Sequence, residues 1–266
     1  QATYRTADLV ISTNESYREV AKERGRVPAE KIFVVRSGPE ATRFRGVPGR
    51  EEHKRGKRYL VAYLGVMAPQ DGVDYLLRAA KHLRDGGRDD VSYTLIGSGD
   101  SFEDLQELSR RLGLDDVVRF TGRIGDPEVE DILSSADVCV GPDPKNPLND
   151  VSTMNKILEY MALGKPIVAF DLKETRFSAG DGALYATPNE EADLAAKIAK
   201  LLDDADLRRE MGEYNRKRFR AGLAWEFNQA ELVRAYDLLL GVRRRAGELP
   251  AGTPASGGPP AGEAAS

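Results

Sequence analysis

The stretch Tyr59-Leu60-Val61-Ala62-Tyr63-Leu64 is followed by a glycine-flanked loop at 65–72 and by a helical pattern over 73–85. An unbroken apolar run of this length predicts a buried strand, because a parallel strand is covered on both faces. In the next segment apolar residues recur at the spacing of one helix face, and Gly86-Gly87 predict its end. One strand, one loop and one helix form the unit from which the fold is predicted.

The same unit repeats along the chain. Further strands are predicted at 91–96, 117–120, 138–140, 166–170 and 183–185, and helices beginning near Phe102, Glu128, Thr153, Glu191 and Asp204. Right-handed crossovers place helices on both faces of a parallel sheet. The order therefore predicts an α/β, Rossmann-like, doubly wound domain of about six parallel strands over residues 59–224.

The segments on either side of this domain have different patterns. Residues 1–42 predict a strand, a helix capped within Ser12-Thr13-Asn14, and a second strand. Residues 43–58 are rich in basic side chains and lack apolar periodicity, so we expect a solvated linker. Residues 225–245 predict a last helix with one apolar face that needs a partner surface. Residues 246–266 are mostly Ala, Gly and Pro, which predicts a disordered tail.

Charge and composition exclude several classes of function. The 39 Lys and Arg residues nearly balance the 43 Asp and Glu residues, so we expect no nucleic-acid partner. No apolar stretch reaches the roughly 18 residues of a membrane-spanning helix, and a cytoplasmic location is expected. The single Cys139 lies in an apolar run and is expected to be buried. Asp126, Asp143 and Asp150 are too scattered to predict a metal site.

In a doubly wound sheet, ligands bind at the loops that follow the strands. Gly65 and Gly72 flank the first such loop, where glycine permits either a tight turn or a close approach of backbone to phosphate. Gly97 and Gly99 follow the next strand and resemble the start of a dinucleotide fingerprint. Phe102 stands where its third glycine would be.

The third loop, at 121–127, has backbone at Arg123 and Ile124 that can pair with a flat heterocycle. A nicotinamide dinucleotide would need an acidic ribose ligand about 20 residues beyond the glycines. Asp115 and Asp116 stand near that distance, which keeps dinucleotide-dependent oxidoreduction as an alternative.

The fourth loop and the helix after it contain a charge conflict. Ser152 or Thr153 is expected to cap the helix, which places Lys156 in its first turn. A cation there opposes the helix dipole at a cost of a few tenths to about 1 kcal/mol, whereas a bound phosphate would reverse the sign. Two interpretations follow: an ion pair between Lys156 and Glu159 on a solvated face, or an anion site.

The same segment carries a family resemblance. Lys156-Ile-Leu-Glu159-Tyr-Met-Ala-Leu-Gly164-Lys165-Pro166 resembles the E-A-M-A-x-G-K-P-V-V segment of family 4 retaining glycosyltransferases, which have the GT-B fold. The similarity covers residues 59 to about 240. It includes Tyr63-Leu-Gly65, Gln70-Asp-Gly72, Leu95-Ile-Gly97-Ser-Gly99, Val118-Arg-Phe-Thr-Gly122 and Ala136-Asp-Val.

The resemblance implies a hexosyltransferase of bacterial-type glycan biosynthesis with a nucleotide-sugar donor, UDP-sugar being favoured over GDP-sugar, and no further cofactor. Residues 59–224 would be the donor-binding domain and residues 1–42 a remnant of the acceptor-binding domain. The helix at 225–245 would cross back to that remnant. A glycan or lipid-linked acceptor would bind the absent part, with a peripheral place at the inner membrane face. The isolated chain would bind donor without transferring sugar, and no catalytic residue can be assigned.

The resemblance also carries residues over. Glu159 matches the second acid of an E-x7-E motif, whose carboxylate accepts hydrogen bonds from ribose hydroxyls. The position of the first acid is Val151, with Asp150 one place before it, and this pair is the candidate sugar contact. The remaining donor-binding candidates are Gly65, Gly72, Gly97, Gly99, Arg123, Ile124, Ser152, Thr153 and Lys156.

Two cations that usually contact the diphosphate in this family are replaced. The arginine after the first glycine is Val66, and the lysine six positions beyond that glycine is Asp71. A diphosphate in a cleft still needs cationic or amide donors. Our hypothesis is that Lys156, with the amides of Ser152 and Thr153, replaces them.

Two further functions share this architecture. The altered diphosphate loop allows a domain that binds a nucleotide or a partner without turnover. A GT-B nucleotide-sugar epimerase is the second alternative, against which the Gly164-Lys165-Pro166 segment argues.

Overall fold

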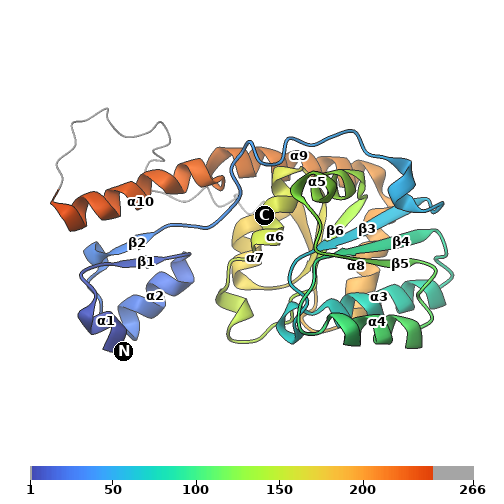
Figure 1. Cartoon of the computed structure of the whole chain (residues 1–266), viewed down its shortest axis with the longest axis horizontal. Helices are drawn as coiled ribbons and strands as arrows, with labels where there is room; N and C mark the ends of the chain where they lie inside the picture. The colour runs from blue at the N-terminus through green and yellow to red at the C-terminus, as the bar shows by residue number, and fades with distance from the viewer. Residues whose placement is uncertain (1, 242–266) are drawn as a thin grey trace, which may run out of the picture.

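The computed structural model describes residues 2–241 and has a six-stranded parallel sheet within its larger domain (Figure 1). The strands are β3 (Tyr59–Leu64), β4 (Val91–Ile96), β5 (Val118–Gly122), β6 (Val138–Gly141), β7 (Ile167–Phe170) and β8 (Ala183–Ala186). Their spatial order is β5-β4-β3-β6-β7-β8. The predicted doubly wound α/β fold of about six parallel strands is confirmed.

Strand β3 shows why the sheet needs helices on both faces. Tyr59, Val61 and Tyr63 belong to one buried cluster, whereas Leu60 and Ala62 belong to another on the opposite face. The order of the strands reverses between β3 and β6. In folds of this type ligands bind outside the carboxyl ends of the strands at such a reversal.

The helices form two layers. On the face of Tyr63 the cluster includes residues of α3 (Val73–Asp85), α4 (Phe102–Arg111) and α8 (Glu191–Asp203). On the other face it includes α5 (Asp126–Ser135), α6 (Asn155–Ala162) and α7 (Lys173–Ala179), while α9 (Ala205–Gly222) packs against α6. Helix α7 was not predicted. Short 3-10 turns are η1 (Ala29–Lys31), η2 (Glu51–Lys54), η3 (Pro69–Asp71), η4 (Asn149–Val151) and η5 (Gly180–Gly182).

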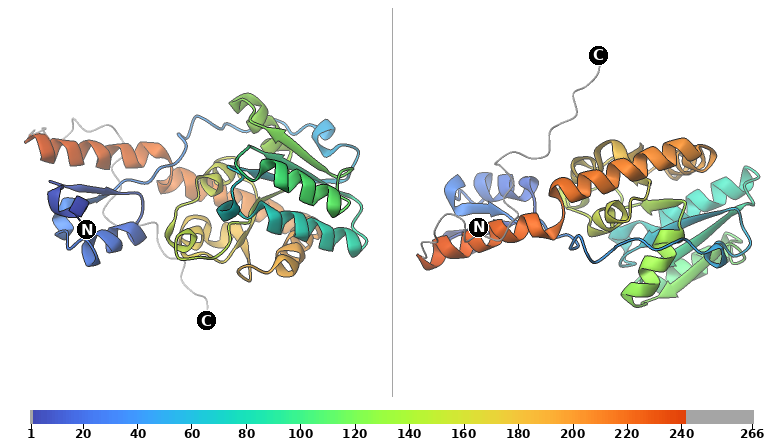
Figure 2. Two further views of the ribbon diagram at one scale, coloured as in Figure 1. Left: turned by 60° about the horizontal axis from the view of Figure 1, so that its bottom comes forward. Right: turned by 90° about the horizontal axis from the view of Figure 1, so that it is seen from above.

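The first part of the chain forms a small separate unit (Figures 1 and 2). It contains α1 (Ala2–Thr6), β1 (Val10–Ser12), α2 (Glu15–Glu23) and β2 (Ile32–Val34), and the two strands pair in parallel. Within the predicted cap, the Asn14 side chain accepts a hydrogen bond from the Tyr17 amide at 2.8 Å. The predicted strand, helix and strand are therefore confirmed.

Helix α10 (Trp225–Leu240) leaves the large domain and packs on β2. The Trp225 amide donates to the Pro39 carbonyl oxygen at 3.1 Å, so the two chain segments run together (Figure 1). The predicted helix over 225–245 is present to Leu240. Its residues from 242 and the predicted tail at 246–266 lie outside the described residues. Among residues 2–241, no helix combines the length and apolar character needed to span a membrane.

The segment from 43 to 58 passes along helix α5. Most of its residues are exposed, as expected, but it is not free in solvent. The amides of Arg45 and Gly46 both donate to a carboxylate oxygen of Glu130, at 2.7 and 2.8 Å. The Phe44 side chain is buried in the core beneath α5. Although its composition is basic and polar, the segment therefore follows a fixed path along α5.

Candidate functional site

The first two loops interlock at the carboxyl edge of the sheet. The Gly65 amide donates to the Ile96 carbonyl oxygen, and the Gly97 amide donates to that of Gly122, both at 3.0 Å. A Cβ atom on Gly97 would lie 1.9 Å from the Gly65 carbonyl oxygen, and Gly97 has a φ of +127°. The structure thus gives Gly97 a role that is neither of the two left open, the close packing of one loop on another.

Gly72 and Gly99 serve similar contacts. A Cβ on Gly72 would come within 2.1 Å of the Pro142 carbonyl oxygen, which follows β6. A Cβ on Gly99 would lie 2.5 Å from the Met67 carbonyl oxygen. The four predicted glycines are therefore gathered in one layer of backbone at the strand ends.

Lys156 is buried beside this layer. It is the second residue of α6, and its ammonium lies 2.5 Å from a carboxylate oxygen of Asp143 and 3.7 Å from one of Asp71. The Tyr63 ring is 5.2 Å from the ammonium nitrogen. Burial raises the pKa of Asp71, although Lys156 and the Ala68 amide act in the opposite direction. Two carboxylates thus face one ammonium.

The ion pair between Lys156 and Glu159, one of the two interpretations of this segment, does not form. A Glu159 carboxylate oxygen instead lies 3.3 Å from the Arg43 guanidinium, and its side chain is 14% exposed. Burial raises the pKa of Glu159, and Arg43 lowers it in part. The carboxylate expected to bind ribose is consequently close to solvent but already paired.

Neither Ser152 nor Thr153 caps helix α6, and that prediction is wrong. The cap position is Met154, because residues before it form η4 and an extended stretch. The Ser152 amide donates to the Asn149 carbonyl oxygen. The Thr153 hydroxyl accepts a hydrogen bond from the Asn14 side chain at 3.1 Å. The Ser152 amide is therefore occupied in this structure, and both residues lie against the start of α2.

The candidate sugar-contact residues, Asp150 and Val151, have other partners. A carboxylate oxygen of Asp150 accepts from the Lys173 amide at 3.0 Å, at the start of α7. The Val151 carbonyl oxygen accepts from the Asn14 side chain at 2.9 Å. The structure thus places Asp150 against α7 and Val151 against α2.

The third loop approaches the site from the other side. Arg123 is exposed, and Ile124 packs against the same core as α6. Asp126, which begins α5, binds the Arg43 guanidinium through both carboxylate oxygens, at 3.2 and 3.3 Å. The third loop, Arg43 and Glu159 are therefore neighbours.

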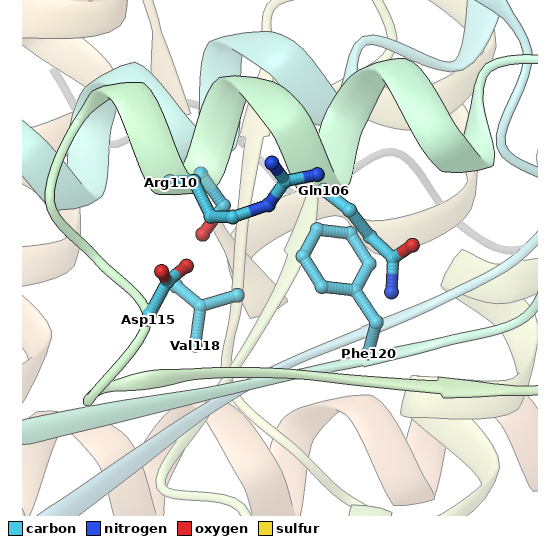
Figure 3. Close-up of a pocket in the computed structure, with 6 residues that line it drawn as sticks. Gln106, Arg110, Asp115, Val118 and Phe120 are labelled. Carbon is cyan, nitrogen blue, oxygen red and sulfur yellow. The ribbon is translucent and has the colours of Figure 1, made fainter.

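Two cavities among the described residues lie away from this site. One, of about 280 Å³, is lined by α4 and β5; Figure 3 shows Gln106 and Arg110 on the helix facing Phe120. The other, of about 420 Å³, lies along α9 and is lined by Gly164, Arg208, Arg209, Gly212, Glu213, Arg216, Lys217 and Arg220. Neither contains a predicted donor-binding residue.

The first cavity bears on the oxidoreductase alternative. Asp115 lines it, and Asp116 pairs with Arg84. Both acids precede β5, whereas Gly97 and Gly99 follow the parallel strand β4. Acids and glycines therefore lie at opposite ends of the strands, and a dinucleotide could not contact both as that alternative requires.

The sequence did not identify two residues that pair with site candidates. These are Asp143, which pairs with Lys156, and Arg43, which pairs with Glu159. Asp143 lies just beyond Pro142 in the loop that follows β6, so its place after a strand was the available signal. Arg43 had no comparable signal, because its segment has no periodicity.

Among residues 2–241, no group of three His, Cys, Asp or Glu side chains is arranged to hold a metal ion.

Solved structures share this fold. The Anabaena protein HepE in complex with UDP and glucose matches with a TM-score of 0.75 at 19% identity, over 89% of this chain and 65% of that one. Sucrose-phosphate synthase from Thermosynechococcus elongatus gives a TM-score of 0.73 at 22% identity, over 91% of this chain and 61% of that one. The fold is that of the GT-B glycosyltransferases.

Residues 58–204, more than half of the chain, match the family model of the glycosyl transferases group 1, and the chain belongs to this family. Among its relatives, alpha-D-kanosaminyltransferase from Streptomyces kanamyceticus is 28% identical over 217 residues, 79% of this chain and 55% of the relative. D-inositol 3-phosphate glycosyltransferase from Nocardia farcinica is 29% identical over 248 residues, which are 87% of this chain and 52% of that relative. The chain spans about half the length of these relatives.

Proposed function

We propose that this chain is the donor-binding half of a family 4 retaining glycosyltransferase that transfers a hexosyl group from a UDP-sugar. Residues 59–224 bind the donor, residues 43–58 link them to a remnant of the acceptor domain at 1–42, and helix α10 crosses back to it. The solved relative in complex with UDP and glucose supports the choice of donor.

The position of Lys156 is the observation that carries the proposal. In the family a lysine six positions beyond the first glycine contacts the diphosphate, and here that position is Asp71. The Lys156 ammonium lies 3.7 Å from the Asp71 carboxylate, so α6 supplies a cation next to the place where the family has one. This arrangement supports Lys156 as the replacement.

The donor then follows the edge of the sheet. Its diphosphate lies by Lys156 and the loop at 65–72, its ribose by Glu159, its base by the backbone of Arg123 and Ile124, and its sugar near residues 150–151. A fixed positive charge at the departing diphosphate stabilises the transition state more than the ground state, which is the main contribution we assign to the protein. The catalytic base stays unassigned.

The acceptor belongs to the other half of the active site. We propose a glycan or lipid-linked acceptor bound by the first domain of a longer protein, in the cytoplasm at the inner membrane face. The chain described here would bind donor without transferring its sugar.

Binding of UDP, GDP and ADP, measured by calorimetry, tests the proposal. We expect UDP to bind, and Lys156→Ala or Glu159→Ala to weaken it about 10-fold or more, because a hydrogen bond to a charged group contributes about 1.5 to 3 kcal/mol. Lys200→Ala, at an exposed position on α8, is the matched control. Unchanged affinity in a folded Lys156→Ala protein would remove Lys156 from the site.

Donor hydrolysis by the longer protein separates the alternatives. A transferase slowly releases free sugar from its donor, a binding module releases none, and an epimerase converts the nucleotide sugar without a second substrate. The family membership favours the transferase.

A further inference from the structure

Arg43 joins two helices that begin at the candidate site. Its guanidinium binds Asp126 at the start of α5, at 3.2 and 3.3 Å, and Glu159 one turn into α6, at 3.3 Å. We refer to this set of three side chains as the Arg43 bridge. It spans the space between the third loop and the carboxylate expected to bind ribose.

The backbone on both sides of Arg43 is fixed. The Ala41 amide donates to both carboxylate oxygens of Glu226, at 3.0 and 3.2 Å. Phe44 is 2% exposed in the core beneath α5. The Arg43 side chain itself is 42% exposed. Fixed flanking residues and an exposed side chain mean that the guanidinium is held at this place and can still exchange partners.

The two contacts of the bridge differ. Asp126 receives two hydrogen bonds from the guanidinium and Glu159 receives one. The Arg43 side chain is exposed in both pairs, so neither pair is expected to contribute much to stability. Because Asp126 keeps two hydrogen bonds to the guanidinium, the single bond to Glu159 is the one that a competing ligand can replace while Arg43 stays on Asp126.

We propose that Arg43 closes the ribose subsite in the donor-free protein, and that a ribonucleoside diphosphate sugar displaces Arg43 from Glu159 when its ribose hydroxyls bind this carboxylate. The inference rests on the proposed function, because that function assigns ribose to Glu159. It adds a residue that tunes the preference of the site for ribose.

Ribose discrimination measures the competition directly. The ratio of the affinities of UDP and 2′,3′-dideoxy-UDP isolates the hydroxyl contacts, since the diphosphate and base are the same in both. We expect Arg43→Gln to raise this ratio about two- to fivefold, the range that corresponds to one exposed ion pair. The loss of the arginine charge acts on both ligands equally and cancels in the ratio.

Two further variants complete the test. Arg45→Gln is the matched control, because Arg45 is exposed and binds α5 through its backbone amide. It should leave the ratio unchanged. Arg43→Lys keeps the charge but has no planar fork to bind Asp126 and Glu159 together, so an intermediate ratio is expected. High salt should reduce the difference between Arg43→Gln and the unaltered protein.

The outcomes are distinct. An unchanged ratio in Arg43→Gln, with unaltered thermal unfolding, would refute competition at Glu159. A lower ratio would mean that Arg43 helps to bind ribose, which also contradicts the inference. If no variant binds UDP at all, the proposed function itself fails.

Discussion

Lys156 shows how a single buried side chain sets the charge of the site. Its ammonium is shared by Asp143 and Asp71, at 2.5 and 3.7 Å. A diphosphate that approaches Lys156 therefore also approaches two carboxylates, and like charges repel. Asp71 is the group whose pKa is raised by burial. Protonation of Asp71 would remove one of the two negative charges that an incoming anion meets.

Asp71→Asn should therefore tighten UDP binding several-fold and stabilise the protein at neutral pH. A carboxyl with a raised pKa in the folded state stabilises it fully only below the unfolded value of about 3.9, and that contribution is lost as pH rises through the folded pKa. The advantage of Asp71→Asn should hence grow from acidic to neutral pH. Calorimetry and thermal unfolding across this range provide the measurement.

Asp74→Asn is the control, since Asp74 forms an ordinary ion pair with Arg78 on α3. A gain in UDP affinity from that variant would mean that net charge, and not the place of Asp71, is responsible. No gain from Asp71→Asn would contradict the role given to its charge.

At the scale of elements, the loops after β3, β4 and β5 act as one layer. Backbone hydrogen bonds join Gly65 to Ile96 and Gly97 to Gly122, and a side chain on Gly97 would collide with the Gly65 carbonyl oxygen. Each loop is thus positioned by its neighbour. A change in one of them should move the others.

Gly97→Ala should destabilise the protein by about 3 kcal/mol or more, because it combines a strained φ with a backbone collision. Gly87→Ala is the matched control: Gly87 has a φ of +85°, and a Cβ there meets no atom within 4 Å. In Gly87→Ala, the backbone strain alone should lower the free energy of unfolding by about 1 to 2 kcal/mol. Urea unfolding gives both values, and equal losses would show that the loop contact has no energetic consequence.

At the scale of the whole molecule, the small N-terminal unit and the large domain meet through buried polar groups. The Ser16 hydroxyl donates to one Glu174 carboxylate oxygen at 2.5 Å, and the Arg36 guanidinium lies 3.5 Å from the other. Arg36 also lies over the Phe177 ring, and burial lowers its pKa. These contacts hold the small unit against α7.

Glu174→Ala should cost about 3 to 5 kcal/mol, since it leaves the Arg36 charge buried without its partner. Glu231→Ala removes an exposed ion pair on α10 and should cost less than about 1 kcal/mol. Thermal unfolding compares the two, with limited proteolysis to detect release of the small unit. Similar losses in both variants would mean that the buried pair does not hold the units together.

Much of the fold could be predicted from local patterns in the sequence. Strands β3 and β4 and helix α3 have the predicted bounds, because runs of apolar residues and glycine stops act on near neighbours in sequence. The start of α6 was wrong by two residues. There the chain forms η4 and contacts Asn14, a partner that no local rule identifies.

By itself, the sequence determined the parallel α/β architecture, the loops that carry the candidate site, and the glycines that those loops need. Only the tertiary structure decided what each charged residue binds. Glu159 and Arg43 are 116 positions apart, and Lys156 found Asp143 and Asp71 instead of Glu159. Periodicity reports burial within one element, whereas the partner of a charge depends on how several elements meet in space.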